Sequence, residues 1–122
     1  MLYIDGAHRY APALADIRTY GVRVADGGTM LIHDSFSSIG VTLAILRSLA
    51  FGSTFRYVGR SRSMTIYRAD LATAGTGRLR NAGRQLGQLP WFARNVALKV
   101  LLTLGLGKVL GRFGRPVPEW PY

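Results

Sequence analysis

The sequence predicts an α/β fold, in which parallel strands alternating with helices are completed by an antiparallel hairpin and followed by a helical tail. Strand-like and helix-like segments alternate through residues 1–70, the order that produces a parallel sheet. The length of 122 residues suits one small domain. A hydrophobic content of 48% accompanies the net charge of +10, and this content excludes a polar, disordered nucleic-acid-binding chain.

The first strand and helix carry clear local signals. Residues 2–4 are a short apolar run of strand-forming residues, ended by an Asp-Gly pair. Leu14, Ile17 and Tyr20 recur every three residues, which predicts an amphipathic helix over residues 11–20. Pro12 fits the first turn of this helix, where its missing N–H costs little.

A second strand, a second helix and a hairpin follow. The apolar run at 29–32 follows an Asp-Gly-Gly turn and is too short for a helix, which indicates a buried strand. Ser37 or Ser38 is expected to cap a helix that runs to about Ala50. Two strand-like runs at 55–58 and 64–67 are joined by a polar loop at 59–63, which predicts an antiparallel hairpin.

Charge and composition divide the chain into two regions. Eight arginines and five aspartates give residues 1–70 a net charge of +3, whereas six arginines, two lysines and one glutamate give residues 71–122 a net charge of +7. Residues 71–77, rich in Ala, Thr and Gly, are expected to be a linker. The basic, apolar region at 78–122 is expected to form the helical tail.

The absence of cysteine excludes disulfide scaffolds, Cys-ligated metal sites and thiol catalysis. It is compatible with a reducing compartment, and we expect a cytoplasmic location. The first residues enter a strand directly, so no signal peptide is expected.

Polar residues follow both parallel strands at their carboxyl ends. Asp5 and His8 come after the first strand, and His33 and Asp34 after the second. Ligands of parallel α/β sheets bind at this edge, and carboxylates with imidazoles are ligands for a divalent cation. The chain has two histidines, and both lie here. The alternative is that these residues serve only in turns and helix starts.

The same segment resembles the second half of a class I S-adenosylmethionine-dependent methyltransferase. The subgroup pattern is D-G-x-H-x-Y, a helix with an internal Asp, a Gly-Gly turn and a strand ending in His-Asp. The matching residues are Asp5, Gly6, His8, Tyr10, Asp16, Gly27, Gly28, His33 and Asp34. The resemblance covers residues 2–70 and implies the C-terminal half of a Rossmann-like sheet, because the family's glycine-rich cofactor loop would precede this segment.

The resemblance also implies an activity and roles for individual residues. Relatives include catechol and sugar O-methyltransferases, so the implied reaction transfers a methyl group to a hydroxyl of a sugar or small metabolite. His8 would be the general base, a task that suits an imidazole. Asp5, His33 and Asp34 would hold Mg²⁺, and Asp5 would also contact S-adenosylmethionine. The alternative is a non-catalytic protein that retains half of the methyltransferase fold.

Three interpretations compete for the tail. Its helices could pack on a missing N-terminal half or on a second subunit of a homo-oligomer. Residues 84–112, with Trp91, Phe92 and flanking cations, could instead lie on a membrane surface. The apolar stretch at 96–106 is shorter than the ~20 residues that span a bilayer. Nucleic-acid binding through Arg78, Arg80 and Arg84 is disfavoured, because aromatic residues do not interleave with these arginines.

Overall fold

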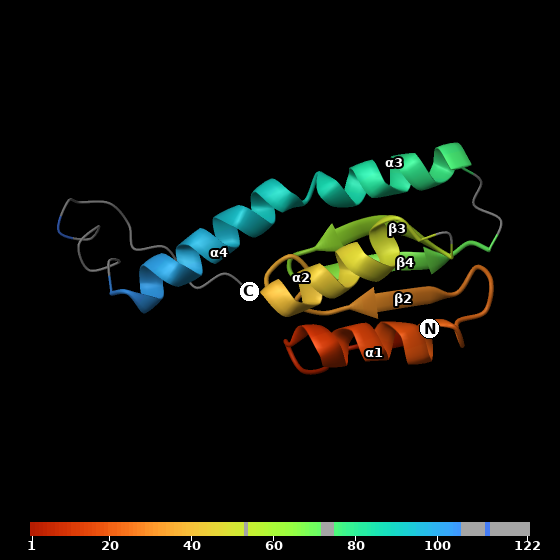
Figure 1. Cartoon of the computed structure of the whole chain (residues 1–122), viewed down its shortest axis with the longest axis horizontal. Helices are drawn as coiled ribbons and strands as arrows, with labels where there is room; N and C mark the ends of the chain where they lie inside the picture. The colour runs from red at the N-terminus through yellow and green to blue at the C-terminus, as the bar shows by residue number, and fades with distance from the viewer. Residues whose placement is uncertain (53, 72–74, 106–111, 113–122) are drawn as a thin grey trace.

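The computed structural model describes residues 1–52, 54–71, 75–105 and 112. The chain alternates strands and helices before ending in two helices (Figure 1). In order, the elements are β1 (Leu2–Ile4), α1 (Tyr10–Gly21), β2 (Thr29–Ile32), α2 (Ile39–Ile45) with its π-helical continuation η1 (Leu46–Ala50), β3 (Phe55–Ser61), β4 (Met64–Ala69), α3 (Gly75–Leu86) and α4 (Leu89–Thr103). The predicted α/β alternation and the hairpin are confirmed.

The four strands form one mixed sheet in the order β1-β2-β4-β3. β1 pairs with β2 in parallel, with Leu2 opposite Met30 and Ile4 opposite Ile32. β4 lies antiparallel between β2 and β3. The sheet therefore combines a parallel pair with an antiparallel hairpin.

The hairpin turn is shorter than the sequence predicts. β3 continues to Ser61, so the connection is a two-residue turn at Arg62 and Ser63 rather than a loop over 59–63. Arg62 adopts a left-handed backbone with a φ of 52°, as tight hairpin turns require. The register shifts between Tyr57 and Gly59. The sequence did not predict this bulge, because it places Gly59 in the loop between the two strands.

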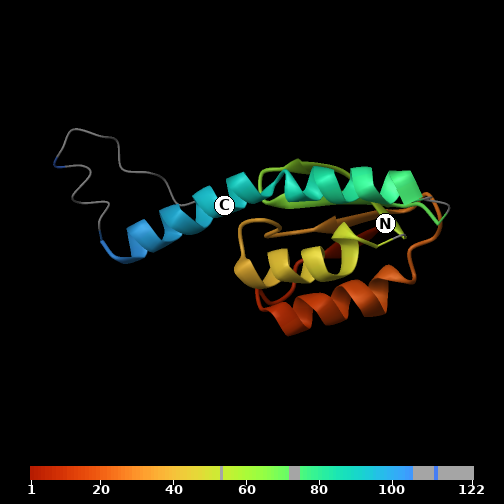
Figure 2. The same cartoon turned by 45° about the horizontal axis from the view of Figure 1, so that its top comes forward.

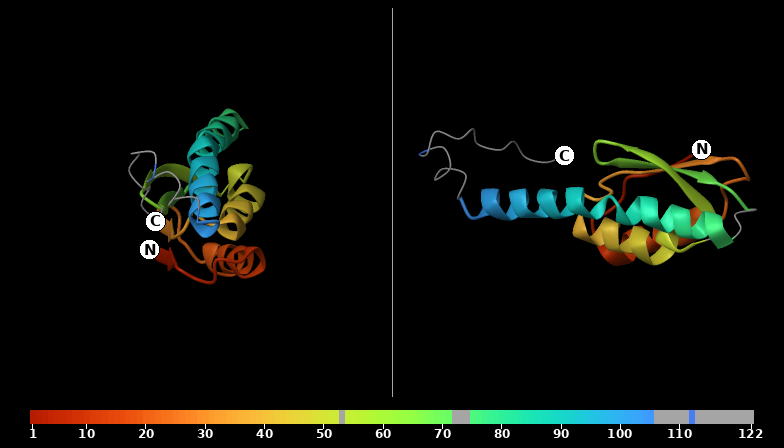
Figure 3. Two further views of the ribbon diagram at one scale, coloured as in Figure 1. Left: turned by 90° about the vertical axis from the view of Figure 1, so that its left-hand side faces the viewer. Right: turned by 90° about the horizontal axis from the view of Figure 1, so that it is seen from above.

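The sheet buries one face, and the described residues leave the other face uncovered. Side chains alternate along each strand, so Met30, Ile32 and Tyr67 lie in the core, whereas Tyr3 on the opposite face is 51% exposed. Both views in Figure 3 place the described helices on one side of the sheet. The described part of the molecule is thus a two-layer structure with one hydrophobic core between helices and sheet.

The predicted helix start at the serines is correct in place and wrong in mechanism. Ser38 occupies the N-cap position of α2, yet its hydroxyl makes no capping hydrogen bond. Ser38 Oγ donates instead to the His8 carbonyl at 2.8 Å. The residue therefore ties the start of α2 to the loop after β1.

α3 begins inside the segment that composition assigned to a linker. It starts at Gly75, and residues 72–74 of the predicted linker lie outside the described residues. Asn81 on this helix pairs with the backbone of the edge strand β3: its Nδ2 donates to Phe55 O at 3.0 Å, and its Oδ1 accepts from Tyr57 N at 2.7 Å. Arg84 donates to Tyr57 O and Val58 O. These bonds satisfy backbone groups that an open edge strand would expose.

Buried amides further along the tail join it to the same core. Gln85 is fully buried, accepts from the Tyr67 hydroxyl at 3.0 Å and donates to Leu49 O at 3.3 Å. Burial raises the pKa of Tyr67 well above its usual value. Asn95 on α4 donates to Phe36 O at 3.3 Å. α3 and the first half of α4 therefore pack within this chain (Figure 2).

Asn81→Ala should lower the free energy of unfolding by about 1–3 kcal/mol, because a buried donor and a buried acceptor of β3 would lose their partner. Chemical denaturation of the unmodified protein and of Asn81→Ala measures this difference. Leu79→Ala is the matched control on the same helix, since Leu79 is 73% exposed, and should change stability by less than about 0.5 kcal/mol. Equal effects of the two substitutions would contradict the edge-pairing role of Asn81.

Candidate functional site

The four predicted site residues meet at the carboxyl edge of the parallel pair. The register of β1 and β2 continues beyond the strands, because His33 N donates to Ile4 O at 2.9 Å. This bond sets the residues after β1 beside the residues after β2. The structure thereby brings Asp5 and His8 together with His33 and Asp34.

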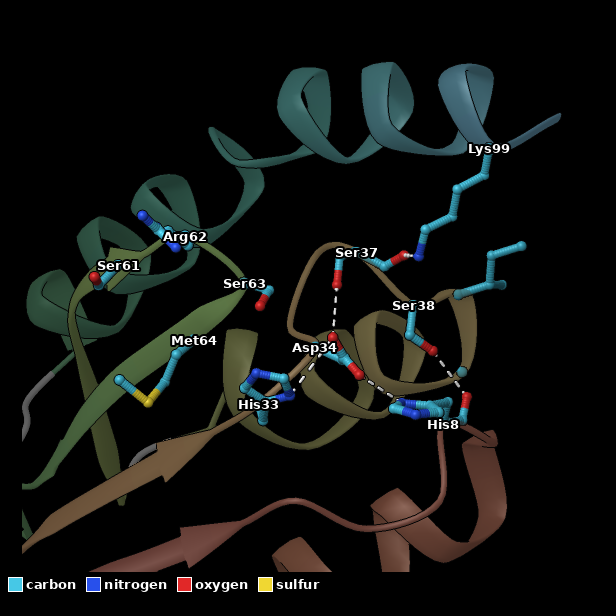
Figure 4. Close-up of a pocket in the computed structure, with 12 residues that line it drawn as sticks. His8, His33, Asp34, Ser37, Ser38, Ser61, Arg62, Ser63, Met64 and Lys99 are labelled. Atoms are coloured by element: carbon cyan, nitrogen blue, oxygen red, sulfur yellow. Dashed lines mark hydrogen bonds and ion pairs between the residues drawn. The ribbon is translucent and has the colours of Figure 1, made fainter. Parts of the chain in front are cut away.

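His8 and Asp34 form the closest pair at this edge (Figure 4). His8 Nδ1 lies 2.6 Å from Asp34 Oδ2. At this distance a proton lies between the two atoms, because two unprotonated lone-pair atoms would repel each other. In a neutral imidazole the other nitrogen, Nε2, is then the basic one. Asp34 Oδ1 accepts in addition from Ser37 Oγ at 3.3 Å, which fixes the carboxylate.

His33 lies between the two carboxylates. Its Nδ1 is 3.3 Å from Asp5 Oδ1 and 3.5 Å from Asp34 Oδ1. The atom is shielded from solvent and makes no hydrogen bond of good geometry with the described residues, so these approaches are electrostatic. Asp5 Oδ2 accepts from the Tyr3 hydroxyl at 3.3 Å. The ring of His33 thus separates Asp5 from the His8–Asp34 pair.

The predicted magnesium ligands Asp5, His33 and Asp34 lie close together, and their binding of a metal ion stays a prediction. Within the described ranges, no group of three or more histidine or acidic side chains could hold one. Asp34 Oδ2 faces His8 Nδ1, whereas Asp34 Oδ1 faces both Ser37 Oγ and His33 Nδ1, and His33 Nδ1 also faces Asp5 Oδ1. The chemistry available at this edge is therefore that of an imidazole supported by a carboxylate.

A pocket of about 900 Å³ opens beside the His8–Asp34 pair (Figure 4). Three parts of the chain form its walls: the ends of the parallel strands with the start of α2, the tip of the hairpin, and α4. The lining residues are His8, His33, Asp34, Ser37, Ser38, Ile39, Gly40, Ser61, Arg62, Ser63, Met64 and Lys99. Asp5 is not among these residues, and its Oδ1 lies 3.3 Å from Nδ1 of the lining residue His33. Of the predicted residues, His8 has the best access to a bound molecule.

The position of His8 depends on a close approach that the sequence did not reveal. The start of α2 lies against the backbone of residues 8–10, where Gly40 leaves no room for a side chain. A Cβ at position 40 would lie 2.6 Å from Tyr10 N and would also clash with His8 O. Asp34 and Phe36 take left-handed backbone conformations, with φ of 52° and 56°, in the turn that leads into α2.

Two cationic residues of the pocket, Lys99 and Arg62, are not among the site residues that the sequence predicts. Lys99 donates from Nζ to Ser37 O at 2.7 Å, although 62 residues separate the two positions. Arg62 reaches the pocket from the hairpin turn. Lys99 interrupts an apolar stretch, and this charge was the available signal. Its partner depends on the packing of α4, which no local pattern specifies.

No family model matches this sequence, and searches of curated proteins and of solved structures found no match. The resemblance to methyltransferases therefore rests on the motif residues. The strand topology and the geometry of the pocket do not depend on that resemblance.

Gly40→Ala should destabilise the protein by about 1–3 kcal/mol, because the added methyl group meets rigid backbone of residues 8–10. Gly83→Ala is the matched control: nothing lies within 4 Å of its Cβ position on α3, so alanine should stabilise by about 0.5–1 kcal/mol. Thermal and chemical unfolding measure both changes. A stabilising Gly40→Ala would show that α2 does not hold the His8 loop in this way.

Proposed function

We propose that this chain is the acceptor-binding, proton-abstracting part of an S-adenosylmethionine-dependent O-methyltransferase. The acceptor would be a sugar or another small metabolite with a hydroxyl group. The observation that carries the proposal is the His8–Asp34 pair, which lies on a pocket at the carboxyl edge of the parallel strands. The parallel pair followed by an antiparallel hairpin supports an assignment to the C-terminal half of a Rossmann-like sheet.

The proposed chemistry assigns a proton transfer to His8. S-adenosylmethionine, when bound, supplies a methyl group on a positively charged sulfur. His8 Nε2 takes the proton of the acceptor hydroxyl as the oxygen bonds to the methyl carbon and the carbon–sulfur bond breaks. Asp34 holds Nδ1–H and stabilises the imidazolium that forms. The pocket walls orient the acceptor, which reduces the entropic cost of reaction.

The cofactor would be held mainly by a second half of the domain. Within the described residues, the connection from β1 to α1 contains one glycine, Gly6, whose Cβ position lies 2.7 Å from Asp16 Oδ2. This connection is not a glycine-rich loop that cradles a cofactor. β1 pairs with β2 alone in the described sheet, and its other edge is open to the cofactor-binding half. Asp5, at the end of β1, is the residue proposed to reach the cofactor.

His8→Ala should reduce methyl transfer by about 10²–10⁴-fold, the usual contribution of a general base. The gene is expressed together with the DNA that precedes it, and transfer from S-adenosylmethionine with a tritiated methyl group to a pool of sugars and hydroxylated metabolites is measured. Thr19→Ala, an exposed change on α1, is the control and should retain activity. Full activity of His8→Ala removes His8 from the mechanism, and no transfer by the unmodified protein overturns the proposed function.

A second candidate is a non-catalytic role at a membrane surface through residues 84–112. The second half of α4 projects beyond the sheet (Figures 1 and 2), with Val100 52% and Leu104 67% exposed. Arg94 is exposed on the same helix. Exposed apolar side chains together with cations favour binding to anionic lipid. In the described ranges, no helix combines the length and the apolar character needed to cross a bilayer.

Co-sedimentation with vesicles of phosphatidylserine and phosphatidylcholine tests this candidate. Binding at low salt should fall several-fold in the double variant Val100→Asp, Leu104→Asp, because both changes place a negative charge on the projecting surface. Leu79→Asp is the control, since Leu79 is an exposed apolar residue of α3 outside the projecting surface. If the unmodified protein stays in the supernatant at low salt, the membrane candidate is excluded.

A further inference from the structure

We propose that the pocket beside His8 selects an acceptor that carries an anionic group, a phosphate or a carboxylate, because Lys99 and Arg62 give two of its walls a positive charge. The proposal rests on the proposed function for the identity of the ligand as an acceptor. The site itself follows from the charges and contacts of the pocket walls.

The charges that line the pocket favour an anion. Lys99 and Arg62 both carry a positive charge at neutral pH. Among the described lining residues, Asp34 is the one carboxylate, and it already lies 2.6 Å from His8. A neutral sugar would leave both cations without an ionic partner. A phosphate or carboxylate would instead accept charge-assisted hydrogen bonds, which are stronger than neutral ones.

Lys99 is held in place for this task. Its side chain extends from α4 toward the start of α2, where Nζ donates to Ser37 O at 2.7 Å (Figure 4). An ammonium group has three donors, so two remain for a ligand. Because the carbonyl already orders the side chain, a ligand pays little additional conformational entropy to engage it.

Arg62 supplies a second positive charge to the pocket, from a different element. It occupies the two-residue hairpin turn, and its left-handed backbone keeps that turn tight. No carboxylate of the described residues lies within ion-pair distance of its guanidinium. A guanidinium presents several donors in a plane and binds phosphate or carboxylate through two of them. The hydroxyl-bearing neighbours Ser61 and Ser63 also line the pocket.

The two cations and the base lie on different walls. Lys99 comes from α4 and lies on the same side of Asp34 as His8, whereas Arg62 comes from the hairpin and lies on the opposite side (Figure 4). Positive charge therefore reaches the pocket from two of its walls, one of them on the side of the base. The two cations act as a specificity determinant, because they favour a charged acceptor over a neutral one.

A titration of the isotope-labelled 122-residue chain with inorganic phosphate, followed by NMR, tests the site. We expect saturable shifts of the backbone amides at residues 61–64 and 98–100, and no such shifts with glucose at equal concentration. Lys99→Met and Arg62→Gln should each weaken phosphate binding by roughly tenfold. Arg80→Gln is the control, since it removes one charge from an exposed position of α3 away from the pocket. Acetate in place of phosphate distinguishes a carboxylate from a phosphate preference.

Absence of saturable shifts with both anions, or equal weakening by Arg80→Gln, overturns the anion site. If phosphate binds as expected while methyl transfer is absent, the proposed function fails and the anion site stands. If Lys99→Met and Arg62→Gln transfer methyl groups to an anionic acceptor as fast as the unmodified protein does, the anion site fails and the proposed function stands.

Discussion

The parallel pairing of β1 with β2 is the interaction on which both the sheet and the site depend. It places Ile4 opposite Ile32 and continues through the bond from His33 N to Ile4 O. Side chains alternate along a strand, so a shift of one residue would turn Ile4 away from the core. The same shift would separate Asp5 from His33 and move the His8 loop away from Asp34. One register therefore determines the packing of the core and the composition of the pocket.

Polar contacts fix the position of the helical tail. Asn81, Gln85 and Asn95 are buried amides, and each is bonded to backbone carbonyls of the sheet or of the segments beside it. A buried amide without a partner is costly, so these residues permit few alternative positions of α3 and α4. Through these bonds α3 and the first half of α4, which belong to the basic region, are joined to the same core as residues 1–70.

The strands and helices could be predicted because their signals are local, whereas the errors involve contacts between distant residues. The bulge near Gly59 depends on pairing with β4, so the sequence suggested a loop. The meeting of His8 with Asp34 followed from the topology of parallel strands. The closeness of Asp34 to His8, 2.6 Å between the two side chains, could not be predicted, because it depends on a turn in which Asp34 has a left-handed backbone. Lys99 escaped notice because its partner lies 62 residues earlier.

The contacts of α4 with one turn of the chain have a thermodynamic consequence. Asn95 donates to Phe36 O, and Lys99 donates to Ser37 O. Both carbonyls belong to the turn that begins at Asp34 and leads into α2. A displacement of α4 would withdraw an ammonium group from the pocket, so the position of this helix and the occupancy of the pocket are linked equilibria. Linkage is reciprocal in binding free energy. A molecule that holds the projecting end of α4 and a ligand in the pocket would change each other's affinity by the same factor, which makes α4 a route for heterotropic control of the site.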